Sequence, residues 1–363
     1  MADRRVAFVV PHPYVDALAC FRAPIQWLAD HGWRVDLYTT LSAEHPAPFF
    51  NRDNVTLVPI QQSRRGVVEL MARLVTTRPK YRAIVAVPQW GLYYCARAAK
   101  LAGVPIGCIS DELKSDDEAA SGDARRWRAR ERQAHQQCRW TVALSVERAD
   151  FVRRENRLPD SHPVFVVPNA SSGPAVRHSS TYFRDRLALG ADARILLHAG
   201  SLWWSRAKEL AAVANHWPDD WTVVFQTRLR LGENGFHDSG RVRFAREVLP
   251  AALLDYAVSS ASIGLALYDD SSVNNRLMGT ASGKVALYLK NGLPVIVTRA
   301  GGFDWVEREG CGACVADVRE IPAAAERIWA NYAETAARAT AFYDRSLDFS
   351  THFPAVAEFM ASL

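Results

Sequence analysis

The sequence has no apolar run of about 20 residues, which is the length that a membrane-spanning helix requires. Its first residues pass from Arg4 and Arg5 directly into a short apolar stretch, without the small-residue cleavage site of a signal peptide. We therefore expect a cytoplasmic protein. The chain also has little net charge. A net charge of +5 in 363 residues favours anionic ligands or an anionic membrane face, but it is too small to indicate nucleic acid.

Cysteine is sparse, and most of the cysteines stand far apart, so we expect reduced, mostly buried thiols. Cys311 and Cys314 form a CxxC motif, but no second CxxC or HxxxH lies nearby to complete a zinc site. The acidic pairs at 116–117 and 269–270 do not form a DxD motif at a strand end, so we expect no metal. The six cysteines are Cys20, Cys95, Cys108, Cys138, Cys311 and Cys314.

Apolar runs and amphipathic segments alternate along the first half of the chain. Residues 5–10 (RVAFVV) are continuously apolar, which is typical of a strand buried on both faces. Such alternation predicts a parallel sheet with helices on both faces. The expected strands cover 5–10, 35–40, 55–60, 83–88, 105–110, 141–145 and 164–169, and the expected helices cover 17–32, 66–77, 92–103, 124–138 and 146–156.

Serine, glycine and proline concentrate in residues 169–181 (NASSGPAVRHSST), which predicts a linker. Alternation then starts again, so we expect two doubly wound α/β domains whose strand ends surround a central cleft. Expected strands of the second domain cover 195–200, 221–227, 241–245, 263–268, 294–298 and 313–317, and expected helices cover 205–217, 249–261, 283–292, 321–346 and 353–363.

The turn at 279–283 (GTASG) comes just before a predicted helix that begins with Lys284. The first N–H groups of a helix have no intrahelical partner, and together with the helix dipole they suit a phosphate group. Gly283 lets the backbone approach a ligand, and Ser282 and Lys284 add a hydroxyl and a positive charge. The turn therefore fits an anion site, although Ser282 as a simple helix cap explains it equally well.

Segment 284–296 (KVALYLKNGLPVI) resembles the K-x-x-E-Y-x-x-x-G-x-P-V-I segment of GT-B glycosyltransferases, in particular the retaining family-four class. Segments 164–170 (VFVVPNA), 196–210 (LLHAGSLWWSRAKEL), 243–268 and 109–113 (ISDEL) resemble further parts of that family in the same order. The resemblance implies the GT-B fold, with two Rossmann-like domains. It places an acceptor domain at 1–175, a nucleotide-sugar domain at 183–341, and a last helix at about 342–363 on the first domain.

Several positions depart from the family pattern. The two glutamates that the family carries with seven residues between them correspond here to Gly279 and Leu287. The arginine that follows the glycine opening the second domain is Ser201 here, and its lysine partner is Arg206. These departures leave open the donor, the retaining or inverting outcome, and a catalytically inactive protein.

A nucleotide-sugar donor releases a diphosphate, whose growing charge must be met by cations and backbone N–H groups. The resemblance and the strand ends together suggest Arg206, Lys208, Ser282, Gly283 and Lys284 for this role. Arg206 and Lys208 also fit a solvated helix face. Residues suggested for the sugar or nucleotide are Ser201, Arg228, Phe244, Arg246, Asn275, Gly279 and Thr280.

Three residues at strand ends of the first domain are candidates for catalysis. Glu112 and Asp111 follow a buried strand, where a carboxylate can accept the proton of an acceptor hydroxyl, with Glu112 the stronger candidate. An acidic pair favoured by a helix dipole is the structural alternative. His12 lies in the loop after the first strand and can hold a sugar, or only the loop's own backbone.

Segment 124–140 is rich in arginine and ends at Trp140, with Trp127 inside it. It fits either a peripheral contact with an anionic membrane or a lipid-phosphate acceptor, or else a solvated helix face with internal ion pairs.

We predict a glycosyltransferase of polysaccharide biosynthesis that moves a sugar from a nucleoside diphosphate sugar to a hydroxyl acceptor, which is a glycan, a lipid-linked glycan or a small molecule. We expect retention of configuration, no metal and no cofactor. A nucleotide-sugar epimerase of the same fold and a non-catalytic nucleotide-sugar-binding subunit remain alternatives. An NAD-dependent oxidoreductase is less supported, because no strand is followed by GxGxxG.

Overall fold

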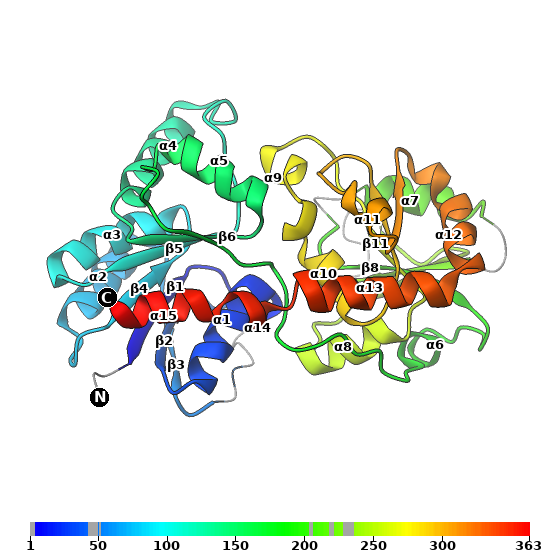
Figure 1. Ribbon diagram of the computed structural model, residues 1–363, viewed down its shortest axis with the longest axis horizontal. Helices are drawn as coiled ribbons and strands as arrows, with labels where there is room; N and C mark the ends of the chain where they lie inside the picture. The colour runs from blue at the N-terminus through cyan, green and yellow to red at the C-terminus, as the bar shows by residue number, and fades with distance from the viewer. Residues whose placement is uncertain (1–3, 43–49, 51, 203–205, 218–220, 228–235) are drawn as a thin grey trace. The chain divides into compact units, whose positions relative to one another are not determined.

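The computed structural model describes residues 4–42, 50, 52–202, 206–217, 221–227 and 236–363, with the side chain of residue 252 left out (Figure 1). The chain divides into two compact units. The first unit contains Met1–Ser172 and the tail Phe349–Leu363, and the second contains Gly173–Asp348. Each unit is built on its own parallel sheet, so the predicted α/β class with two doubly wound domains is confirmed.

The first unit has a seven-stranded sheet in the order β3-β2-β1-β4-β5-β6-β7, and every neighbouring pair is parallel. The strand order reverses at β1, as in a Rossmann sheet. All four residues of β4 and of β6, and all five of β5, are buried, because helices cover both faces. The strands are β1 (Arg5–Val10), β2 (Arg34–Thr39), β3 (Val55–Pro59), β4 (Ala83–Ala86), β5 (Ile106–Ser110), β6 (Trp140–Ala143) and β7 (Val164–Val166).

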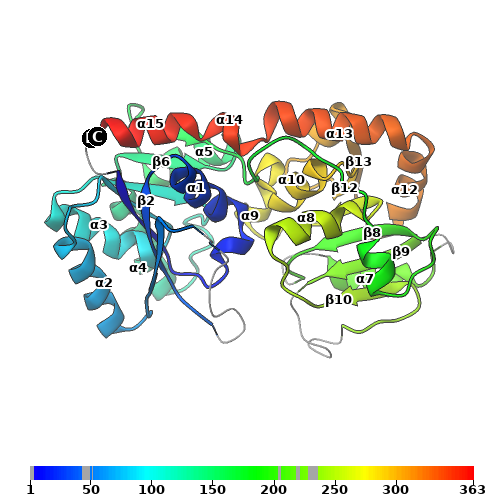
Figure 2. The same ribbon diagram turned by 90° about the horizontal axis from the view of Figure 1, so that it is seen from below.

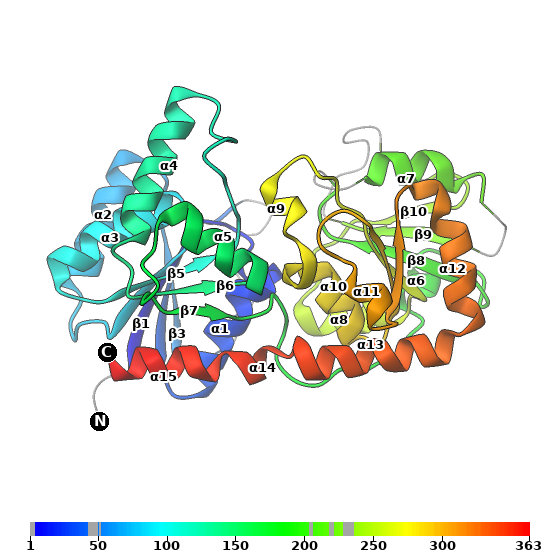
Figure 3. The same cartoon turned by 45° about the horizontal axis from the view of Figure 1, so that its top comes forward.

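Helices cover both faces of this sheet (Figure 3). Helices α2, α3 and α4 lie on one face, and α1 lies on the other together with the tail helix α15. Phe359 of α15 packs against Trp140 and Phe165, with ring centroids 6.0 and 5.6 Å apart. The helices are η1 (Val15–Ala17), α1 (Ala19–Asp30), α2 (Arg64–Thr76), α3 (Trp90–Ala102), α4 (Gly122–His135), α5 (Val146–Asn156), α14 (Phe349–His352) and α15 (Pro354–Ser362).

The second unit has a six-stranded parallel sheet in the order β10-β9-β8-β11-β12-β13. Here the order reverses at β8, so the loops after β8 and β11 meet at the switch point of the sheet, where ligands bind in such folds. The strands are β8 (Arg194–Ala199), β9 (Trp221–Gln226), β10 (Val242–Ala245), β11 (Ile263–Ala266), β12 (Val295–Thr298) and β13 (Gly312–Val315).

In the second unit α10 lies between the sheet and α13 (Figure 2). Helices α7 and α12 pack on the opposite face. The helices are α6 (Tyr182–Arg186), α7 (Ala207–Ala214), α8 (Ala251–Ser259), α9 (Val273–Arg276), η3 (Gly279–Ala281), α10 (Gly283–Lys290), α11 (Trp305–Arg308), η4 (Val318–Glu320), α12 (Ile321–Ala330) and α13 (Tyr332–Ser346).

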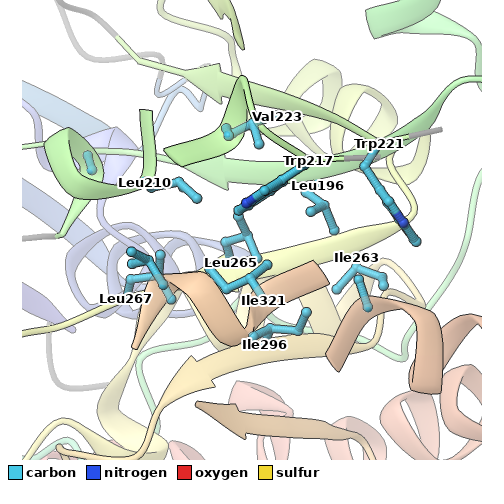
Figure 4. Close-up of a cluster of buried hydrophobic side chains, with 14 of the residues drawn as sticks. Leu196, Leu210, Trp217, Trp221, Val223, Ile263, Leu265, Leu267, Ile296 and Ile321 are labelled. Carbon is cyan, nitrogen blue, oxygen red and sulfur yellow. The ribbon is translucent and has the colours of Figure 1, made fainter. Parts of the chain in front are cut away.

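A large apolar cluster fills the space between this sheet and helices α7 and α12 (Figure 4). Leu196 and Leu265 project from neighbouring strands toward Leu210 of α7 and Ile321 of α12, and all four are fully buried. Removing such side chains from water is the main stabilising contribution to the unit.

One glycine in each sheet makes room for a buried aromatic ring. A Cβ on Gly264 in β11 would lie 2.2 Å from the ring of Tyr288 in α10, and a Cβ on Gly107 in β5 would lie 2.0 Å from the ring of Trp140. Tyr288 uses this space to donate a hydrogen bond to the Leu265 carbonyl, at 3.1 Å. Close packing at Gly264 thus fixes α10 against the sheet.

The six cysteines are all buried and none is disulfide-bonded, as the sequence predicts for reduced thiols. Burial raises the pKa of the thiols of Cys311 and Cys314, so the CxxC motif has no reactive thiolate. Among the helices that the structure describes, none combines the length and apolar content that crossing a bilayer requires.

Candidate functional site

The chain between β11 and β12 starts at the carboxyl edge of the second sheet and includes the turn at 279–283. It contains the short helices α9 and η3 and then enters α10 at Gly283. Ser282 caps α10, since its Oγ accepts a hydrogen bond from the N–H of Val285 at 3.3 Å, and the Tyr268 hydroxyl lies 2.9 Å from the same Oγ. The other N–H groups of the first turn have no partner within the helix, as at every helix start.

Gly279 is held where a side chain does not fit. Its φ is +37°, its N–H donates to the Gly301 carbonyl at 2.7 Å, and a Cβ would lie 3.2 Å from the Gly302 carbonyl oxygen. This position corresponds to the first glutamate of the GT-B family pattern. The backbone therefore closes the turn around a residue without a side chain, and no carboxylate is present there.

Lys284 extends from the first turn of α10 toward the end of β8. Its Nζ lies 3.1 Å from Nε2 of His198, 3.2 Å from the Ser201 carbonyl and 5.5 Å from the ring centroid of Tyr268. Within the described part of the chain, none of its partners is a carboxylate. Because no counter-ion among these residues offsets desolvation, the pKa of Lys284 falls to about 7.

His198 is the fully buried partner of Lys284, near the end of β8. Its Nε2 also lies 3.2 Å from the Ser201 carbonyl, while Nδ1 is buried without a partner among the described residues. Burial and the neighbouring Lys284 lower the pKa of the ring well below its usual value, so the imidazole is neutral. His198 is not among the residues predicted from the sequence, although a histidine inside the apolar run ILLHAG is unusual.

Gly200 allows Lys284 to lie across the turn after β8. Its φ of +113° is unfavourable for any residue with a side chain, and a Cβ would lie 3.1 Å from Cε of Lys284. Gly200 thus belongs to the site because the absence of a side chain leaves room for Lys284.

Arg206 stands at the start of α7, and its charge is already compensated. Its guanidinium pairs with Glu209, lies 3.6 Å from Asp317 and donates to the Ala316 carbonyl at 2.9 Å. The hydrogen bond to Glu209 raises the pKa of Arg206. Lys208 is exposed on α7. The structure therefore brings Lys284, Ser282 and Gly283 together at one turn and gives Arg206 carboxylate partners of its own.

Two of the residues suggested for the nucleotide or sugar, Phe244 and Arg246, lie in or next to β10. Phe244 is only 5% exposed and stacks on Phe225, with ring centroids 4.9 Å apart, so its ring belongs to the core. The guanidinium of Arg246 lies over Phe244 at 4.7 Å and 3.9 Å from Asp238. Arg228 lies outside the described residues.

The other suggested residues surround the turn. Asn275 is 3% exposed and donates from Nδ2 to Asp269 at 2.8 Å, so it shapes the loop after β11. Desolvation raises the pKa of Asp269, but hydrogen bonds from Ser271 and Asn275 outweigh this effect and lower it overall. Thr280 is half-buried in η3, and Ser201 contributes the carbonyl group that faces Lys284.

Asp111 and Glu112 follow β5 in the first unit and differ in their surroundings. Desolvation, followed by the neighbouring charge of Glu112, raises the pKa of Asp111 to about 7. Buried Arg148 donates to the Asp111 carbonyl at 2.7 Å and limits this rise. Glu112 is exposed. A carboxyl group with a pKa near neutrality is suited to accept and release a proton.

His12 is positioned by the loop after β1. The Tyr14 N–H donates to His12 Nδ1 at 3.1 Å, and Thr39 Oγ1 donates to the His12 carbonyl at 2.6 Å. Because Nδ1 accepts a hydrogen bond, Nε2 is the nitrogen that carries the proton in the neutral ring. His12 is half-buried in the loop at the carboxyl edge of the first sheet.

The described residues contain no group of three or more histidine, cysteine, aspartate or glutamate side chains arranged to hold a metal ion. Near the turn of the second unit, Lys284 and the N–H groups at the start of α10 contribute positive charge.

Comparison with known proteins supports the fold. Residues 209–348 match the family model described as the glucosyltransferase 3-like C-terminal domain, which covers less than half of the chain. A search of curated protein sequences gives no match. Solved structures of GT-B glycosyltransferases share the predicted α/β fold with two Rossmann-like units. The GT-B fold predicted from the sequence is therefore confirmed.

Three solved structures illustrate this similarity. HepE from Anabaena, in complex with UDP-glucose, is 16% identical with a TM-score of 0.74 over 99% of this chain and 100% of that chain. Sucrose-phosphate synthase from Thermosynechococcus elongatus is 17% identical with a TM-score of 0.68 over 99% and 98%. WaaG, a glycosyltransferase of lipopolysaccharide biosynthesis, is 12% identical with a TM-score of 0.65 over 98% and 99%.

Proposed function

We propose that the protein is a glycosyltransferase that moves a sugar from a nucleoside diphosphate sugar, with UDP-glucose the first candidate, to a hydroxyl acceptor. The GT-B fold, the match of residues 209–348 to a glucosyltransferase model and the UDP-glucose complex of HepE support this assignment. The observation that carries it is Lys284, a desolvated cation without a carboxylate partner in the described chain, beside the N-terminus of α10.

A desolvated cation is costly unless an anion accompanies it. Lys284 costs the ligand-free protein stability, and a diphosphate recovers this cost by supplying the missing negative charge. The N–H groups at the start of α10 add donors that suit phosphate oxygens. Arg206 does not support a diphosphate site in the same way, because Glu209 and Asp317 already neutralise its charge.

Cleavage of the donor places growing negative charge on the departing diphosphate. We propose that Lys284 and the turn at Ser282 and Gly283 stabilise this charge without a metal, because fixed donors in a partly desolvated site are effective electrostatic catalysts. Retention of configuration is proposed from the family resemblance alone.

For the acceptor we propose Asp111 as the general base, because its pKa of about 7 matches the working pH of a cytoplasmic enzyme. His12 Nε2 is proposed to donate a hydrogen bond to the sugar or to the acceptor hydroxyl. A glycan or a lipid-linked glycan is the proposed acceptor, with polysaccharide biosynthesis as the setting.

A thermal-shift panel of UDP, GDP, CMP, dTDP and ADP and their sugars tests the donor site. We expect stabilisation by UDP and UDP-glucose, by about 2.7 kcal/mol at a concentration 100 times the Kd. No stabilisation by any of these nucleotides would refute the assignment.

A second assay separates the candidate reactions. UDP release that depends on an added acceptor marks a transferase, and conversion of the sugar without acceptor and without UDP release marks an epimerase. Binding without any conversion would identify a nucleotide-sugar-binding subunit, which the replacement of both family glutamates by Gly279 and Leu287 makes a real competitor.

We further propose a cytoplasmic location with peripheral contact to an anionic membrane through the outer surface of α3 and α4. The guanidinium of Arg97 lies 4.4 Å from the ring centroid of Tyr93, and that of Arg130 lies 5.0 Å from that of Trp127. Neither arginine has a carboxylate partner among the described residues, and Leu101 nearby on α3 is 72% exposed. Paired aromatic and basic residues of this kind suit a lipid headgroup region.

Flotation with vesicles that contain or lack phosphatidylglycerol tests this contact. We expect the protein to float only with the anionic vesicles, and the double variant Arg97→Gln and Arg130→Gln to lose most of the binding. The matched control replaces Arg308 and Arg327, two exposed arginines of the second unit, by glutamine. Equal flotation of both double variants would contradict the proposal.

A further inference from the structure

The contact between Lys284 and His198 bears on how the donor site handles protons, an inference that rests on the proposed function. Nζ of Lys284 and Nε2 of His198 are 3.1 Å apart, and both face the Ser201 carbonyl at 3.2 Å. Two basic groups in direct contact, His198 fully buried and Lys284 half-buried, do not both carry a positive charge. Above the Lys284 pKa, an arriving anion therefore favours the addition of a proton to this pair.

The surroundings of the pair supply no negative charge. Lys284 meets His198 from β8, the Ser201 carbonyl from the turn after β8 and the Tyr268 ring from the loop after β11. His198 in turn packs against Phe225 of β9, with ring centroids 5.6 Å apart. Within the described ranges, no carboxylate touches either group, and above neutral pH the ligand-free pair is uncharged.

A bound diphosphate supplies two negative charges next to this pair. The ammonium form of Lys284 then gains an ion partner, and its proton affinity returns toward the value of a lysine in water. His198 must leave Nε2 unprotonated in this state, since a nitrogen that accepts from the ammonium cannot itself carry a proton.

We propose that the donor diphosphate binds together with a proton, which Lys284 takes from solvent, and that His198 is the positioning residue that orients the resulting ammonium toward the diphosphate. The step is balanced: neutral Lys284, one proton and the dianionic donor give an ammonium–diphosphate pair. This proton then offsets the negative charge that grows on the diphosphate as the sugar leaves.

Binding calorimetry on the unmodified protein tests the proposal directly. UDP-glucose is the probe because its two phosphate groups do not titrate between pH 6 and pH 8, so any proton taken up belongs to the protein. Titrations in two buffers of different ionisation enthalpy give the number of protons. We expect uptake of close to one proton at about pH 8 and close to none at about pH 6.

The affinity for UDP-glucose should depend on the same protonation of Lys284. With the Lys284 pKa at about 7, binding should weaken about tenfold from pH 6 to pH 8. Lys284→Met should bind weakly at both pH values and without proton uptake. Lys80→Met, at an exposed lysine of the first unit just before β4, is the matched control and should keep the tenfold change.

Two variants separate the role of His198 from simple packing. His198→Leu removes the acceptor and should move the midpoint of the affinity profile to lower pH, because the ammonium form loses a partner. His198→Gln keeps an acceptor oxygen and should keep the midpoint near that of the unmodified protein. A purely structural role would change the overall affinity but not this midpoint.

The outcomes distinguish this inference from the proposed function. If UDP-glucose does not bind at any pH, the proposed function fails. If it binds without proton uptake at pH 8 and with the same affinity at pH 6, the function stands and the inference is overturned. Uptake that persists in Lys284→Met would place the proton elsewhere and would also overturn it.

Discussion

Replacing Lys284 by methionine should stabilise the ligand-free protein while removing its affinity for UDP-glucose. The methionine side chain fills a similar space and requires no counter-ion. In the protein the pKa of Lys284 falls from 10.5 to about 7. Each unit of such a shift corresponds to about 1.4 kcal/mol of stability, so the whole shift corresponds to about 5 kcal/mol.

This value is an upper limit, because Lys284 is half-buried and water screens part of its charge. We therefore expect a stabilisation of about 2 kcal/mol at neutral pH, which raises the Tm of a unit of this size by about 4–8 °C.

The stability gain from Lys284→Met should depend on pH. Between pH 7 and pH 10.5 the unfolded chain keeps the Lys284 proton and the folded protein loses it, so the stability of the unmodified protein rises with pH. The gain from Lys284→Met should therefore be largest at and below pH 7 and disappear near pH 10. Calorimetric scans across this range measure it, with Lys208→Met as the control. A variant that is no more stable than the unmodified protein at pH 7 would refute the reasoning.

Three further predictions concern other parts of the molecule. Asp111→Asn should slow UDP release 100- to 10,000-fold and abolish the fall in rate below about pH 7, whereas Glu112→Gln should stay close to normal; equal effects would exclude Asp111 as the base. Gly264→Ala forces a Cβ against Tyr288 and should destabilise the second unit by about 1–3 kcal/mol in denaturant unfolding, and an unchanged midpoint would contradict this packing. His135 is buried with a pKa of about 3, so stability should fall as pH drops below 6.5, where the unfolded chain gains a proton, and His135→Gln should flatten that fall.

The main strands were predictable because each is an unbroken apolar run that a parallel sheet buries on both faces. Residues 5–10 and 263–268 illustrate this, since they contain β1 and β11. The long amphipathic helices were predictable from their periodicity, although the single helix expected over 321–346 divides at Asn331 into α12 and α13. Short helices such as α9 and α11 span about one turn and leave no periodic pattern to recognise.

The site was only partly predictable, because its chemistry depends on contacts between distant segments. The turn at 279–283 and Lys284 stood out by their glycines and charge. The ion pair between Arg206 and Asp317 could not be predicted, because the two residues lie far apart in the sequence of the second unit. His198 acquires its role only when α10 brings Lys284 next to β8.

The environment of each group, rather than its identity, decides between similar candidates. Asp111 and Glu112 are adjacent in sequence, yet Glu112 is exposed, whereas desolvation raises the pKa of Asp111 to about 7. Phe244 was suggested for the sugar or nucleotide, but the fold places its ring against Phe225 in the core. Burial of this kind follows from tertiary packing, which local sequence does not contain.

The central claim is that the turn before α10 and Lys284 hold the donor diphosphate. A crystal structure of the protein soaked with UDP tests it most directly. The account predicts a phosphate oxygen within hydrogen-bond distance of Lys284 Nζ and of an N–H group at the start of α10. UDP bound with its diphosphate away from Lys284 would contradict it.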